Sequence, residues 1–321
     1  MTNRNDGKGR ILFAVTGWDP AAWVGEFAKA APEREVVLEP DGADDPTIRY
    51  ATVWKQRPGI LAGLPNLQVI FSVGAGVDHI FRDTNLPNAP IVRIVAEDLT
   101  NRMSEYVVWQ VLDHLRQGPL YRAQQAERVW REPGQPAASE ITVGIMGLGV
   151  LGTDAAQKLR MMGFKLAGWS RQAKEAEGVT CYAGLEQMPD FLGASDIVVV
   201  LLPLTDETRG IVNRDMLATM KRETPLGGPV LINAGRGGLQ VEADILAALE
   251  ADQLMAASLD VFETEPLPEA SPLWNHPRVT VTPHAAASSD PRHLVPQIVR
   301  QMENFEAGKP LENLVDRKAG Y

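Results

Sequence analysis

The stretch Ile141-Thr-Val-Gly-Ile-Met-Gly-Leu-Gly-Val-Leu-Gly152 decides the fold of this chain. An apolar, β-branched run leads into Gly147, Gly149 and Gly152, and apolar residues at helical spacing follow. A G-x-G-x-x-G turn between a strand and a helix predicts a dinucleotide site, with the pyrophosphate on the helix N-terminus. The first glycine permits the turn, the second admits the pyrophosphate, and the third allows close helix packing. An ordinary glycine-rich connection is the alternative. The predicted contacts are Gly147, Leu148, Gly149, Val150, Leu151 and Gly152.

Composition excludes several classes of protein. The chain has 321 residues, long enough for two domains, and its net charge of −10 argues against general nucleic-acid binding or attachment to anionic membranes. Cys181 is the single cysteine, which rules out an internal disulfide and fits a reducing, cytoplasmic compartment. No apolar run approaches the roughly 18 to 20 residues of a membrane span. Residues 1–10 are polar and are expected to form a frayed leader. The histidines show no metal-ligand spacing, so no metal site is predicted.

Short apolar strands alternate with helical segments along the whole chain, which is typical of parallel α/β sheets. A first group of strands precedes residue 101, and a second group follows the glycine turn, so two doubly wound sheets are expected. Ser104 is expected to N-cap a helix that continues through Leu115. Apolar residues cover several faces of that helix, which predicts either burial or a subunit contact. The expected strands are 10–15, 35–38, 50–54, 68–72, 141–146, 165–169, 196–202, 229–233, 256–260 and 278–282.

The end of the second strand after the turn indicates the cofactor. An acid about 20 residues beyond the turn grips the adenosine 2′-OH of NAD, but Ser170 stands there. Without that carboxylate a 2′-phosphate meets no repulsion, and Arg171 and Lys174 could pair with it. NADPH is therefore favoured, with NADH possible but weaker. The alternative is that both cations are solvated surface charges. The predicted cofactor contacts also include four residues at later strand ends, namely Leu202, Pro203, Ala234 and Asp260.

Chemically active side chains also follow strands. Arg236 lies between glycines after a buried strand, where a guanidinium can bind a carboxylate bidentately. His284 follows another strand and could transfer a proton near neutral pH. A carboxylate beside the imidazole would stabilise its charged form, and spacing allows either Glu263 or Glu265. There is a simpler alternative for each residue. Arg236 could pair with an acidic residue at the surface, and His284 could be a buried histidine whose hydrogen bonds are satisfied within the fold.

A second glycine turn, Ser72-Val-Gly-Ala-Gly-Val-Asp78, lies in the N-terminal part. The N–H groups of Gly74, Ala75 and Gly76 could form a backbone nest for a small carboxylate. A plain tight turn is an equally good interpretation of this spacing.

Four segments in this order resemble the D-isomer-specific 2-hydroxyacid dehydrogenases: Gly147–Gly152, Leu231–Gly238, Leu259–Pro268 and Pro272–Ala286. The resemblance covers about residues 65 to 321 and is strongest to the subgroup that reduces glyoxylate and hydroxypyruvate. It implies that Arg236 binds the 2-oxo acid, that His284 protonates its carbonyl oxygen, and that Glu265 supports the imidazolium. It also implies a substrate-carboxylate cradle and an aromatic pocket wall, made by Gly74, Ala75, Gly76 and Trp54.

The resemblance further implies a domain plan and a set of partners. A flavodoxin-like substrate domain is expected over residues 1–100 and 287–321, and a Rossmann coenzyme domain over residues 101–286. Members of the family dimerise through the coenzyme domain, so a homodimer is expected. The function implied is NADPH-dependent reduction of a small 2-oxo acid. A dehydrogenase of a larger D-2-hydroxy acid and a non-catalytic dinucleotide-sensing protein are the alternatives.

Overall fold

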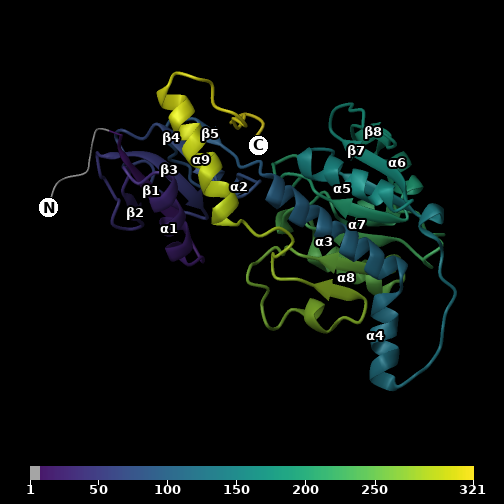
Figure 1. The fold of residues 1–321 in the computed structure, drawn as a ribbon. Helices are drawn as coiled ribbons and strands as arrows, with labels where there is room; N and C mark the ends of the chain where they lie inside the picture. Colours follow the sequence, from purple (N-terminus) through teal and green to yellow (C-terminus); the bar gives the residue numbers. More distant parts are fainter. Residues whose placement is uncertain (1–7) are drawn as a thin grey trace. The chain divides into compact units, whose positions relative to one another are not determined.

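The computed structural model describes residues 8–321, so most of the expected polar leader lies outside the described residues (Figure 1). The chain divides into two compact units. The first unit extends to Leu99 and resumes at Ser289, and the second covers Thr100–Ser288. Both units are α/β and built on parallel sheets, which confirms the predicted fold class. Within the described residues, no helix is both long and apolar enough to span a bilayer.

The sheet of the first unit has five parallel strands in the order β2-β1-β3-β4-β5. Helix α9 packs beside α1, so the C-terminal segment completes the unit that the N-terminal segment begins (Figure 1). Tyr50 and the buried Arg34 both bond the carboxylate of Glu306, at 2.8 and 2.6 Å, which fixes the end of α9. The elements are β1 (Arg10–Val15), α1 (Pro20–Ala30), β2 (Val36–Leu38), β3 (Ile48–Trp54), β4 (Val69–Ser72), α2 (Asp78–Phe81), β5 (Ile91–Val92) and α9 (Pro291–Glu306).

The sheet of the second unit has seven parallel strands in the order β12-β11-β10-β9-β6-β7-β8. Its order reverses between β6 and β9, and such a switch point is where open α/β sheets bind ligands. The strands are β6 (Thr142–Met146), β7 (Lys165–Ser170), β8 (Thr180–Ala183), β9 (Ile197–Val200), β10 (Val230–Asn233), β11 (Ala256–Leu259) and β12 (Val279–Val281). The helices are α3 (Glu97–Leu115), which begins at the unit boundary, α4 (Gly118–Glu127), α5 (Val150–Met161), α6 (Met188–Ala194), α7 (Arg214–Thr219) and α8 (Glu242–Glu250). Short 3₁₀ turns occupy Ala138–Glu140, Leu185–Gln187, Gly237–Leu239 and Pro272–Asn275.

Both faces of this second sheet are buried. The β9 side chains alternate between two separate apolar clusters: Val198 and Val200 join one, while Ile197 and Val199 join the other. A strand covered on both faces reads as a continuous apolar run instead of an alternating one. This is why the apolar run at residues 196–202 predicted a buried strand correctly.

Helix α3 corrects one prediction. It begins at Glu97, so Ser104 lies inside the helix and is not its N-cap. The Ser104 hydroxyl donates to the carboxylate of Asp154 on α5. The side chain predicted to cap the helix thus makes a tertiary contact instead. The helix buries Val107 and Val111 but leaves Trp109 52% exposed.

Candidate active site

The glycine turn joins β6 to α5 with the geometry that a pyrophosphate requires. Gly147 has φ +108°, and a Cβ there would lie 2.8 Å from the Leu201 carbonyl oxygen. A Cβ on Gly152 would lie 2.0 Å from the Gly147 carbonyl oxygen, so the helix packs too closely for any side chain. In front of Gly149 no atom lies within 4 Å of the Cβ position. The N–H groups that follow belong to the first turn of α5 and have no intrahelical acceptor. These residues fit a dinucleotide.

The predicted 2′-phosphate region lies at the end of β7. Ser170 is buried, and its hydroxyl donates to the Gln172 carbonyl at 2.6 Å. Arg171 forms an ion pair with Glu207, and Lys174 donates to the Leu148 carbonyl at 2.8 Å. The Lys174 ammonium therefore lies against the glycine turn. Leu202, Pro203 and Ala234 follow the adjacent strands β9 and β10.

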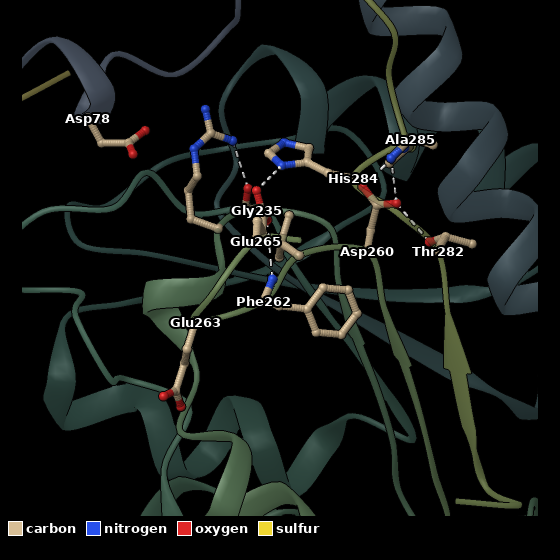
Figure 2. Close-up of polar contacts among 12 residues, drawn as sticks. Asp78, Gly235, Asp260, Phe262, Glu263, Glu265, Thr282, His284 and Ala285 are labelled. Atoms are coloured by element: carbon tan, nitrogen blue, oxygen red, sulfur yellow. Dashed lines mark hydrogen bonds and ion pairs between the residues drawn. The ribbon is translucent and has the colours of Figure 1, made fainter. Parts of the chain in front are cut away.

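The candidate catalytic residues come from the ends of three neighbouring strands, β10, β11 and β12. His284 Nδ1 lies 2.9 Å from Glu265 Oε2 (Figure 2). Glu263, the other carboxylate that spacing allowed, lies apart and exchanges two 2.7 Å hydrogen bonds with Glu242. The other oxygen of Glu265 accepts from the Phe262 amide at 3.2 Å. The structure thus joins His284 to Glu265, the glutamate that the family resemblance implied.

Asp260 fixes the backbone around His284 through hydrogen bonds. It is 1% exposed, and its carboxylate accepts from Thr282 Oγ1 at 2.7 Å and from the amides of Ala285 and Ala286 at 2.8 and 3.0 Å (Figure 2). The His284 amide donates to the Asp260 carbonyl at 2.8 Å. His284 has φ +52°, a left-handed conformation that costs about 1–3 kcal/mol and persists only when its surroundings enforce it. Sequence reasoning listed Asp260 as a cofactor contact and missed this anchoring.

Arg236 begins the turn after β10. Its Nη1 donates to the Gly235 carbonyl at 2.8 Å, and its side chain is half-buried. The side-chain amide of Asn233 donates to the Arg236 carbonyl at 3.2 Å and to Gln240 Oε1 at 2.8 Å. These two bonds fix the loop that carries Arg236. A Cβ on Gly237 would lie 1.8 Å from the Phe262 carbonyl oxygen, so the loop packs directly against the segment that leads to Glu265.

The remaining predicted residues lie in the first unit and contact one another. Trp54 ends β3, and a Cβ on Gly74 would lie 2.3 Å from its ring. The Ser72 hydroxyl bonds the Gly74 and Gly76 carbonyl oxygens at 3.0 and 3.1 Å and folds the turn back on itself. The Gly74 amide points to the Ser72 oxygen at 3.3 Å, so it is directed into the turn.

An open dinucleotide turn, with an arginine and a histidine–carboxylate pair at the same edge of the parallel sheet, defines a nicotinamide-dependent oxidoreductase. Residues 108–286 match the family model for the NAD binding domain of D-isomer specific 2-hydroxyacid dehydrogenases. A curated relative, glyoxylate/hydroxypyruvate reductase A of Serratia proteamaculans, is 38% identical over 97% of this chain and 99% of its own length. The chain belongs to the D-isomer specific 2-hydroxyacid dehydrogenase family.

Solved structures agree with this assignment. An NADPH-dependent glyoxylate/hydroxypyruvate reductase of Sinorhizobium meliloti, solved with NADP and sulfate, is 48% identical, with TM-score 0.93 over 98% of this chain and all of that chain. A D-isomer specific 2-hydroxyacid dehydrogenase of Xanthobacter autotrophicus, solved with NADPH and MES, is 41% identical, with TM-score 0.92 over 98% of this chain and 99% of that chain.

Proposed function

We propose that this chain is an NADPH-preferring reductase of small 2-oxo acids such as glyoxylate and hydroxypyruvate, and that it forms the D-hydroxy acid where the product is chiral. The observation that carries the proposal is the 2.9 Å contact of His284 with Glu265 at the sheet edge that also bears the glycine turn. Relatives that share nearly the whole chain bear this activity in their names.

The proposed reaction adds a hydride to the carbonyl carbon and a proton to the carbonyl oxygen. The nicotinamide supplies the hydride when the cofactor is bound. His284 Nδ1 is occupied by Glu265, which leaves Nε2 as the nitrogen that gives its proton to the oxygen. The Glu265 carboxylate stabilises the imidazolium that exists before this transfer. Arg236 neutralises the substrate carboxylate and polarises the carbonyl, because its guanidinium stays charged and offers two parallel donors.

We assign the coenzyme domain to residues 101–286 and the substrate domain to residues 1–100 and 287–321. The Gly74–Gly76 turn would hold the substrate carboxylate through the N–H groups of Ala75 and Gly76, because the Gly74 amide is directed to Ser72 Oγ. Trp54 would form the adjacent pocket wall, which the packing of its ring on Gly74 supports. A homodimer formed through the coenzyme domain is supported by two exposed tryptophans, Trp109 on α3 and Trp130 after α4. The single cysteine supports a cytoplasmic location.

The NADPH preference rests on Ser170. Ser170→Asp would place a carboxylate where a 2′-phosphate lies, and repulsion would oppose NADPH while the carboxylate bonds the NADH ribose. We expect the ratio of kcat/KM for NADPH over NADH to fall by about tenfold, the size of one charge-assisted contact. Ser170→Asn is the matched uncharged control. An unchanged ratio in Ser170→Asp would contradict the 2′-phosphate argument.

The deciding experiment follows NADPH absorbance with glyoxylate, hydroxypyruvate and pyruvate in turn, and repeats each assay with NADH. Rapid NADPH oxidation with glyoxylate or hydroxypyruvate, and slow oxidation with NADH, is the expected result. If none of the three acids causes NADPH oxidation although NADPH binds tightly, the proposal is overturned. The chain would then act on a bulkier substrate or be a non-catalytic dinucleotide-sensing protein.

A further inference from the structure

His79 is a buried histidine for which the mechanism has no role. It lies in α2, is 4% exposed, and has both ring nitrogens in contact with polar groups. The Lys55 backbone amide donates to Nδ1 at 3.2 Å, and Nε2 lies 3.2 Å from Ser72 Oγ. One of these partners follows the end of β3, and the other begins the Gly74–Gly76 turn. The imidazole therefore joins the segment proposed as the pocket wall to the turn proposed to receive the substrate carboxylate.

The partners fix the tautomer of His79. A backbone amide can only donate, so Nδ1 must carry the lone pair and Nε2 the proton. The Nε2–H group then donates to Ser72 Oγ, and the single Ser72 hydroxyl hydrogen is shared between the carbonyl oxygens of Gly74 and Gly76. All of these hydrogen bonds hold together when the ring is neutral. A second proton on the ring would break the bond from Lys55.

The Gln56 side-chain amide is compatible with the same tautomer when its oxygen and nitrogen are exchanged. Its Oε1 lies 3.4 Å from His79 Nδ1, although both atoms would be acceptors, while its buried Nε2 has no hydrogen-bond partner among the described residues. The oxygen and nitrogen of a side-chain amide are assigned from the hydrogen-bond network, so exchanging the two turns Nε2 toward Nδ1. The exchange turns the acceptor–acceptor contact at Nδ1 into a donor–acceptor contact.

His79 also holds the shape of the β3 end. Its ring lies 4.6 Å from the Trp54 ring, which packs on Gly74 and stacks on Trp18 at 5.7 Å. Lys55 has φ +48°, a left-handed conformation that a lysine adopts only when its surroundings enforce it. The hydrogen bond from the Lys55 amide to His79 supplies one such restraint.

We propose that His79, neutral and protonated on Nε2, is a positioning residue that sets the geometry of the substrate-carboxylate cradle by tying Trp54–Lys55 to the Gly74–Gly76 turn. This inference rests on the proposed function, which places the carboxylate at that turn. It predicts that His79 controls the affinity for the 2-oxo acid and leaves cofactor binding and the hydride step unchanged.

The test compares His79→Phe with the wild-type enzyme. Phenylalanine keeps a ring beside Trp54 and removes both hydrogen bonds. The KM for glyoxylate, and the inhibition constant of oxamate, a non-reacting analogue of a 2-oxo acid, should each rise about tenfold, as the loss of two hydrogen bonds implies. The kcat at saturation and the Kd for NADPH, measured by fluorescence, should stay within about twofold of the wild-type values. A general destabilisation of the enzyme would change these two quantities as well.

Two further variants separate positioning from packing. His79→Asn keeps an acceptor near Nδ1 for the Lys55 amide and should recover part of the oxamate affinity. Ser72→Ala removes the hydrogen bond between Ser72 Oγ and His79 Nε2 and leaves the imidazole in place. If His79→Phe does not fold, the oxamate measurement is made on Ser72→Ala instead. Combined with His79→Phe it should add little further loss, because both substitutions interrupt one chain of bonds.

The outcomes distinguish this inference from the proposed function. A wild-type enzyme that reduces no 2-oxo acid and binds no oxamate would overturn both. An active wild-type enzyme whose oxamate affinity is unchanged in His79→Phe and Ser72→Ala would overturn only the role of His79. Equal losses of oxamate and NADPH affinity would also overturn it, since they would indicate a merely structural histidine.

Discussion

Two histidines, one in each unit, differ in the partner of Nδ1. His284 is 30% exposed and sets Nδ1 against the Glu265 carboxylate, whereas the buried His79 receives a backbone amide there. A carboxylate favours the charged imidazolium, while an amide donor is compatible only with the neutral ring. The group that faces Nδ1 thus distinguishes His284, which is suited to deliver a proton, from His79, which stays neutral and holds a fixed position.

The largest expected effect is in His284→Ala. We expect kcat to fall by about 10²-fold or more, because the general acid is lost. The Kd for NADPH should be unaffected. His79→Phe should have the opposite pattern, with a raised KM and an unchanged kcat. Unchanged turnover in His284→Ala would contradict the role of His284 as the proton donor.

Glu265→Gln tests the partner and leaves the histidine in place. Glutamine can still accept a hydrogen bond from Nδ1 but carries no charge, so kcat/KM should fall about tenfold or more, as for the loss of a charge-assisted bond. Glu263→Gln is the matched control: it removes a charge two residues earlier, on a side chain that bonds Glu242, and should leave kcat/KM near the wild-type value. Equal effects of the two substitutions would show that net charge matters more than the Nδ1 contact.

The smallest expected effect is that of replacing Asp290, the N-cap residue of α9. Its carboxylate caps α9 and bonds Arg292, mainly by a side-chain hydrogen bond, which lowers its pKa from 3.8 to about 2. Because the pKa in the folded chain is depressed, the stabilisation is complete above about pH 4 and disappears as the pH falls toward 2. Asp290→Ala should cost about 1 kcal/mol at pH 7, as the loss of an N-cap does.

Thermal unfolding at pH 7 and pH 3 measures this cost. The Tm difference between wild type and Asp290→Ala should be about 2 °C at pH 7 and smaller at pH 3. Asp290→Asn keeps a capping oxygen and should lose less than Asp290→Ala. A larger Tm difference at pH 3 than at pH 7 would contradict the lowered pKa.

The sheets were predictable because local patterns encode them. Short apolar runs separated by helical segments identified most strands of the two sheets. Strands β5 and β8 were missed: β5 has two residues, and β8 is a partly exposed edge strand, so neither carries a strong apolar pattern. Ser104 was misassigned because its partner, Asp154, is 50 residues away.

Side-chain pairing in the site was harder to predict than the strands. Spacing could not separate Glu263 from Glu265, since the choice depends on a loop path fixed by Glu242, 21 residues earlier in the chain. Only the family resemblance indicated Glu265. His79 gave no signal at all, because its partners Ser72 and Lys55 lie 7 and 24 residues away and share no motif with it.

The bond between Arg34 and Glu306 spans 272 residues, and along the sequence the second unit lies between the two segments of the first. During synthesis, the segment that begins the first sheet leaves the ribosome before the second unit, but α9, with its buried Val295, Ile298 and Met302, leaves after it. The nucleotide-binding unit can therefore be complete while the first unit still lacks a helix of its core. The first unit, whose sheet precedes the second unit in the sequence, thus gains α9 only after the second unit has been translated.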